Sequence, residues 1–142
     1  MKHRFIVIDD SELDCFIAEK MIKHTIENEQ VIAFTEAARA LEYITQQGAV
    51  TDQPKAILLL DVLMPVVSGF DFVEAFEQLP PDVQRSYLLV ALTSTMNKND
   101  LSRISGYKSV KHLLDKPITA EALLALLGEI DATAGEPLAG SL

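Results

Sequence analysis

Short runs of apolar residues alternate along the chain with segments in which apolar positions recur every three or four residues. The runs occupy residues 5–8, 31–34, 56–60, 87–92 and 110–114. Apolar runs without polar alternation are typical of strands buried on both faces, and the spacing between them is typical of amphipathic helices. The pattern therefore predicts an α/β fold of five strand–helix units, with a parallel sheet covered by helices.

Several predicted helices begin after a side chain that can cap a helix. Ser11 with Asp14, and Ser68 with Asp71, have the spacing of a capping box, and later helices are expected to begin at Asn97 and Thr119. Apolar stripes of the first and last helices are expected in the core, formed by Leu13, Phe16, Ile17, Met21 and Ile22, and by Leu123, Leu124, Leu126 and Leu127.

The chain is expected to form one domain. Its 142 residues fit a single core, and residues 1–130 carry the whole pattern. Pro80 and Pro81 are predicted to lie in a connection before the fourth strand, because proline cannot continue a helix. Residues 131–142 lack periodicity and are predicted to form a short flexible tail. Such a tail is too short for a separate output module.

Composition narrows the classes of protein to consider. The content of 49% hydrophobic and 23% charged residues indicates a packed globule, and no apolar run approaches the ~20 residues of a membrane span. The start of the chain lacks the apolar length of a secretory signal, and Cys15 is the only cysteine. We therefore expect a cytoplasmic protein. A net charge of -9 argues against nucleic acid as a partner.

Polar residues stand at the carboxyl ends of four predicted strands: Asp9 and Asp10, Asp61, Thr93 and Ser94, and Asp115, Lys116 and Pro117. Ligands of open parallel sheets bind at this edge. Three carboxylates there would repel one another unless a cation lies among them, and oxygen ligands without histidine or thiol favour Mg²⁺. Each group alone is a common turn or cap. Their coincidence predicts a magnesium site formed by Asp9, Asp10 and Asp61.

Lys116 and Thr93 add a positive charge and a hydroxyl at the same edge, and both are groups that bind phosphate oxygens. A carboxylate can attack phosphorus when neighbouring charges neutralise the phosphoryl oxygens. We therefore interpret Asp61 as a nucleophile that is held rigidly by a buried strand.

These motifs resemble the receiver domain of two-component response regulators over roughly residues 4–130. The resemblance rests on Ile8-Asp9-Asp10, Leu60-Asp61-x-x-Met64-Pro65-x-x-Ser68-Gly69, Leu92-Thr93-Ser94 and Asp115-Lys116-Pro117. It implies a doubly wound, flavodoxin-like (βα)5 sheet with strand order 2-1-3-4-5. It also implies a signalling domain that catalyses only its own phosphorylation and dephosphorylation, and is not a turnover enzyme.

The resemblance implies a role for each site residue. Asp61 would accept a phosphoryl group from a sensor histidine kinase or a histidine phosphotransfer protein. Asp10 and Asp61 would bind Mg²⁺ directly, Asp9 through water, and Leu63 through its backbone carbonyl. Thr93 and Lys116 would hold the phosphoryl oxygens. Output would be a changed surface that a downstream protein recognises, or onward phosphorelay.

Two positions depart from the family pattern. Leu113 stands where the family usually has an aromatic switch residue, so a switch would involve another group, such as His112 or Tyr107. Leu63 is apolar where a polar residue is frequent, and we expect it to shield the acyl phosphate from water. The sequence leaves open whether the chain forms a homodimer.

The sequence also bears on three other functions that this architecture can carry. A haloacid dehalogenase-type phosphatase would need a second aspartate two residues after the nucleophile, where this chain has Leu63. A flavodoxin-like FMN binder would need a phosphate loop after the first strand, where Asp9 and Asp10 would repel phosphate. A receiver that works unphosphorylated as a binding module stays open.

Overall fold

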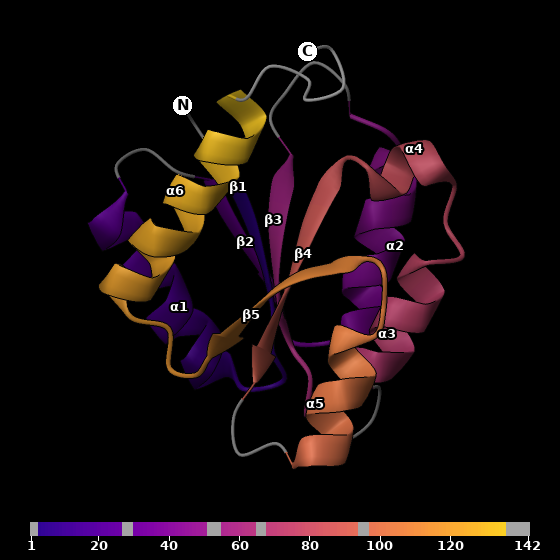
Figure 1. Cartoon of the computed structure of the whole chain (residues 1–142), viewed down its shortest axis with the longest axis horizontal. Coiled ribbons are helices and arrows are strands. Elements are labelled where there is room, and N and C mark those ends of the chain that lie inside the picture. Colours follow the sequence, from indigo (N-terminus) through magenta and orange to yellow (C-terminus); the bar gives the residue numbers. More distant parts are fainter. Residues whose placement is uncertain (1–2, 27–29, 51–54, 65–67, 94–96, 136–142) are drawn as a thin grey trace.

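The computed structural model describes residues 3–26, 30–50, 55–64, 68–93 and 97–135. Within them one five-stranded sheet is formed by β1 (Arg4–Ile8), β2 (Gln30–Phe34), β3 (Ala56–Asp61), β4 (Tyr87–Thr93) and β5 (Val110–Asp115). All neighbouring strands are parallel, in the order β2-β1-β3-β4-β5 (Figure 1). The predicted α/β class and strand order are therefore confirmed.

The described ranges contain six helices, α1 (Glu12–Thr25), α2 (Ala37–Gln47), α3 (Gly69–Phe76), α4 (Pro81–Gln84), α5 (Lys98–Ser105) and α6 (Ala120–Gly135). One apolar cluster joins α1 and α6 to one face of the sheet, and a second joins α2, α3 and α5 to the other. Pro80 and Pro81 lie between α3 and β4 as predicted, and this connection also contains the single helical turn α4. Pro81 is its first residue, where the fixed φ of proline suits a helix start.

The central strand explains the position of the core. All six residues of β3 are buried. Leu58 and Leu60 pack toward α2 and α3, whereas Ile57 and Leu59 pack toward α1 and α6. Burial on both faces is thus confirmed for the middle of the sheet. The edge strands β2 and β5 are partly exposed, because each lacks one neighbouring strand.

The predicted core stripe of α1 is wrong in part. Ile22 is buried and Met21 partly buried, but the exposed fractions are 66% for Leu13, 56% for Phe16 and 48% for Ile17. The helix instead turns Cys15 inward, and its Sγ lies 3.3 Å from the backbone oxygen of Asp9. Burial raises the pKa of the Cys15 thiol to about 11, so this group fills the core as a neutral side chain.

Helix α6 differs from the prediction at one position and in length. Leu123, Leu126 and Leu127 are buried as expected, but Leu124 is 54% exposed and lies outside the core. The helix continues to Gly135, so the first residues of the segment assigned to the tail are helical. Residues 136–142 lie outside the described part of the chain, and a flexible tail there stays a prediction.

Helix caps agree closely with the sequence. Ser68 and Asp71 form a complete capping box at α3, and Asn97 accepts the backbone N–H of Asp100 at α5. At α6 the hydroxyl of Thr119 accepts the N–H of Ala122. The box at Ser11 is only half formed: its Oγ accepts the N–H of Asp14, but the Asp14 carboxylate bonds Lys116 instead.

Candidate functional site

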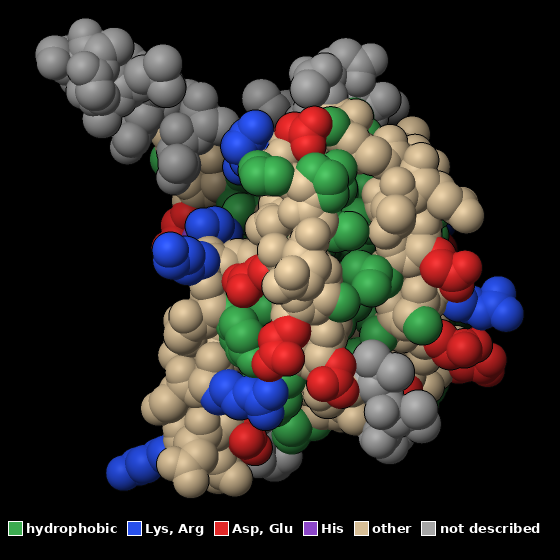
Figure 2. Space-filling view, turned by 90° about the vertical axis from the view of Figure 1, so that its right-hand side faces the viewer, with side chains coloured by type: hydrophobic (Ala, Val, Ile, Leu, Met, Phe, Trp, Pro, Cys, Tyr) green, Lys and Arg blue, Asp and Glu red, His purple; other side chains and the backbone are tan. Residues whose placement is uncertain are grey.

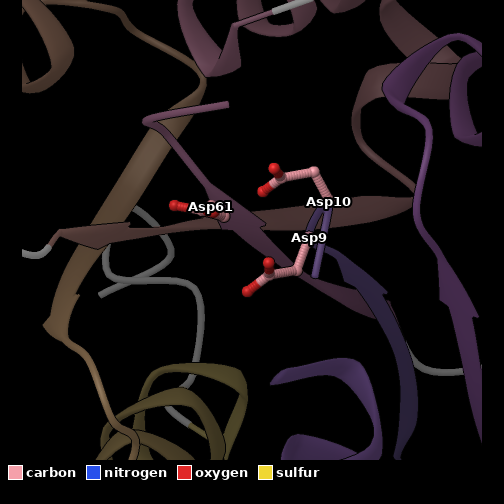
Figure 3. Close-up of side chains that lie close together, drawn as sticks. All are labelled: Asp9, Asp10 and Asp61. Atoms are coloured by element: carbon pink, nitrogen blue, oxygen red, sulfur yellow. The ribbon is translucent and has the colours of Figure 1, made fainter. Parts of the chain in front are cut away.

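The carboxylates of Asp9, Asp10 and Asp61 gather at the carboxyl edge of the sheet. Ile8 on β1 is paired with Leu60 on β3, so the residues that follow these two positions emerge side by side. One carboxylate oxygen from each aspartate lies within 4.8 Å of the others. Figure 3 shows the three side chains extending to the same side of the strand ends. The predicted convergence of these acids is therefore observed.

Burial gives the three acids different properties. Asp9 is 2% and Asp61 5% exposed, whereas Asp10 is open to solvent. Burial raises the pKa of Asp61 to about 6, with the charge of Asp9 acting in the same direction and the charge of Lys116 opposing it. A trio of oxygen donors with crowded negative charge suits a hard divalent cation. The residues present therefore fit the Mg²⁺ that the sequence predicted.

Lys116 follows β5 and bridges several acids. Its Nζ lies 2.6 Å from Asp9 Oδ2, 2.9 Å from Asp14 Oδ2 and 3.7 Å from Asp61 Oδ2. Burial alone would lower the pKa of Lys116, but the hydrogen bonds to Asp9 and Asp14 and the charge of Asp61 raise it above the usual value. The ammonium is therefore a permanent positive charge beside Asp61.

Asp14 is a residue of the site for which the sequence predicted a different role. Its spacing from Ser11 suggested a capping role, and it lies 102 positions from Lys116 in the chain. Its carboxylate gives the lysine a second strong acceptor, so Lys116 is held by α1 as well as by β1. No local signal marks this pairing, which depends on how α1 packs beside the β5 end.

Thr93 ends β4 and is 6% exposed. Its Oγ1 lies 3.3 Å from Asp115 Oδ1 and 3.4 Å from the backbone oxygen of Leu114. The hydroxyl therefore bonds the neighbouring strand β5, and none of the contacts of the described residues joins it to Asp61. Ser94, the other predicted polar residue here, lies outside the described residues.

The turn after β3 holds Asp61 close to the start of α3. The backbone N–H of Leu63 lies 3.3 Å from Asp61 Oδ1, and the N–H of Gly69 donates to Val62 O at 2.8 Å. A Cβ at position 69 would lie 2.5 Å from Val62 Cα, so this close approach requires glycine. Met64 is buried, and Pro65 lies outside the described part.

The positions considered for a conformational switch lie around β5. Leu113 is 41% exposed. Tyr107 donates its hydroxyl to Glu74, and the Arg103 guanidinium bonds the same carboxylate at 3.0 Å. His112 Nδ1 is 3.5 Å from Glu129. Tyr107 thus ties the end of α5 to α3, and His112 lies beside α6.

Among the described residues, no helix is both long enough and apolar enough to span a membrane.

Comparison with known proteins agrees with this geometry. Residues 5–128 match the family described as response regulator receiver domain. Response regulator Rcp1 of Synechocystis sp. is 25% identical over 104 residues, which cover 72% of this chain and 68% of that protein.

Solved structures show the same fold. A response regulator receiver protein from Dyadobacter fermentans has 31% identity and a TM-score of 0.80, with 89% of this chain and 96% of that one covered. A two-component response regulator from Cytophaga hutchinsonii has 22% identity and a TM-score of 0.79, with 92% and 97% covered. The family match covers nearly the whole length of this chain, and the three acids lie together at the carboxyl edge of the sheet. The chain therefore belongs to the receiver-domain family of two-component response regulators.

Proposed function

We propose that the protein accepts a phosphoryl group on Asp61 from a histidine kinase or phosphotransfer protein. The observation that carries the proposal is the position of Asp61 at the end of the central strand. It is 5% exposed, with the ammonium of Lys116 3.7 Å from one oxygen and two further carboxylates nearby. A rigid carboxylate with a fixed positive charge beside it is suited to attack phosphorus.

In this proposal Asp10, Asp61 and the backbone carbonyl of Leu63 bind Mg²⁺ directly, and Asp9 binds it through water. The exposure of Asp10 supports a direct role, and Asp9 supports an indirect one because its oxygens already bond Lys116 and the N–H of Ser11. When bound, Mg²⁺ would neutralise charge on the phosphoryl oxygens.

The transfer requires little from the protein beyond position and charge. An oxygen of Asp61 forms the new bond to phosphorus, the bond from phosphorus to the donor nitrogen breaks, and its electron pair leaves with the donor imidazole. Lys116 would contact a phosphoryl oxygen. Thr93 would reach another only after giving up its bond to β5, which would bias the β4–β5 region between two pre-existing states.

A protein donor is supported by the apolar surface of α1. Leu13, Phe16 and Ile17 are exposed on the first turns of this helix, which begins directly after the acidic pair of β1. Exposed apolar groups that lie together often mark protein interfaces. Output would run through a phosphorylation-dependent protein-binding surface or an onward phosphorelay.

The function can be tested with acetyl phosphate. We expect the wild type to gain one phosphoryl group by intact mass in the presence of Mg²⁺, and none with EDTA. Asp61→Asn should show no gain, because an amide is a poor nucleophile. Asp82→Asn is a matched control, since this exposed aspartate lies on α4 at the opposite edge. Labelling that survives in Asp61→Asn, or turnover of unrelated phosphate esters, would contradict the proposal.

Leu63 is expected to slow loss of the phosphoryl group. Its side chain is 42% exposed two residues after Asp61, where an apolar group hinders the approach of water. Leu63→Asn should therefore shorten the phosphorylated lifetime severalfold, measured by intact mass after removal of acetyl phosphate. Leu124→Asn, an exposed leucine on α6, serves as the control. An unchanged lifetime in Leu63→Asn would show that this leucine has no shielding role.

A further inference from the structure

A cavity of about 320 Å³ lies at the amino-terminal edge of the sheet, opposite the acidic site. Its walls come from the end of α3, from α4 and from the starts of β4 and β5. Four basic residues line it: Lys55, Arg85, Lys108 and Lys111. We call this space the basic cavity. Figure 2 shows Lys and Arg side chains at the upper left of this face and others at its lower left and right, with acidic side chains over the middle and right and also beside the upper basic ones.

The concentration of positive charge contrasts with the rest of the chain. Four of the 12 Lys and Arg residues meet here, in a protein with a net charge of -9. No acidic residue is among the described residues that line the cavity. Within the part of the chain that the structure describes, none of the four cations forms an ion pair. Positive charges that gather in a concave site attract anions and repel cations.

Two described acids close in sequence to the lining residues are hydrogen-bonded within the protein. Glu77 accepts the N–H of Ser109 at 3.0 Å and its hydroxyl at 2.7 Å, and Asp82 accepts the N–H of Val83 at 2.9 Å. These bonds hold both carboxylates on neutral donors. Among the described residues, the positive charge of the basic cavity is therefore not neutralised by an ion pair.

The wall of the basic cavity is rich in donors. Lysine and arginine side chains have no acceptor atoms. Tyr87 also lines the cavity and is 4% exposed. Leu88 and Phe76 add apolar surface. A site with many donors and few free acceptors is suited to a ligand that carries several acceptor oxygens.

We propose that the basic cavity binds a small anion with two or more negative charges, such as a pyrophosphate group or a polycarboxylate. The volume is at the lower end of small-molecule sites, roughly 300 to 1,000 Å³, which fits a compact ligand. The site lies at the opposite edge from Asp61 and does not depend on phosphorylation of that residue.

The first test titrates pyrophosphate, and separately citrate, into the full chain without divalent cations. Amide shifts are followed by NMR, and NaCl at equal ionic strength is the blank. We expect saturable shifts at residues 85–88 and 108–111. Saturation with only one anion would identify phosphate or carboxylate as the ligand class. Shifts that match the NaCl blank, or that saturate only around Lys116, would overturn the proposal.

The second test uses charge-removing variants. The double variant Lys108→Gln with Lys111→Gln should bind the anion roughly tenfold more weakly or worse, the change expected from the loss of about one charge-assisted contact. Lys98→Gln is the control, because this exposed lysine lies on α5 away from the basic cavity. Arg85→Gln provides an independent variant if the double one is poorly folded. Equal weakening by Lys98→Gln would indicate a general charge effect and would refute a specific site.

Discussion

Alanine in place of Gly69 is expected to lower the free energy of unfolding by about 3 kcal/mol, the upper range for overpacking in a rigid environment. The added Cβ would lie 2.5 Å from Val62 Cα and 3.1 Å from the backbone oxygen of Asp61. Both neighbours are backbone atoms, so no side chain can rotate away. The start of α3 must move away from the turn that holds Asp61, and acetyl phosphate labelling should fall with it.

The matched control is Gly128→Ala in α6. No atom lies within 4 Å of the added Cβ, so the only change is the helix preference, which favours alanine by about 1 kcal/mol. Urea denaturation should therefore show opposite signs for the two variants. Equal stability of Gly69→Ala and the wild type would mean that the close approach at Val62 relaxes at no cost.

Asp61→Asn is expected to stabilise the protein at neutral pH without Mg²⁺. The pKa of Asp61 is raised to about 6 from its usual value of 3.8, so the folded state binds its proton more tightly than the unfolded state does. Stability from this group is thus greatest below about pH 4, falls as pH rises toward 6, and stays low above it. The two pKa values differ by about 2, which corresponds to at most about 3 kcal/mol in the free energy of unfolding. The variant should recover this amount at pH 7.

Urea denaturation of both proteins from pH 4 to 7 measures this effect. The gain for Asp61→Asn should grow across that interval and reach a plateau above pH 6. Added Mg²⁺ should reduce it, because a cation stabilises the ionised carboxylates of the wild type. A gain that is independent of pH would show that the effect of the variant does not come from the ionisation of Asp61.

The placement of the acidic edge was predictable because it follows from where the strands end and from their direction, with the strand order supplied by the resemblance to receiver domains. Each apolar run ends where its polar residue begins, and parallel strands bring those ends to one edge. The register of β1 with β3 then sets Asp9 beside Asp61.

The pairing of distant side chains needed the tertiary structure. The rotation of α1 about its axis decided that Cys15 is buried and Phe16 is exposed, whereas periodicity alone had predicted Phe16 in the core. The same packing joined Asp14 to Lys116, and the basic cavity drew its cations from three separate segments.

For this protein the sequence pattern by itself determined the parallel sheet and the acids at its carboxyl edge, because these depend on local pattern and on chain direction. The strand order was implied by the resemblance to receiver domains. Only the tertiary structure decided which faces of the helices are covered, which acids hold Lys116 and where positive charge gathers. The physical reason is that such contacts depend on the packing of elements far apart in the chain, for which neighbouring residues carry no signal.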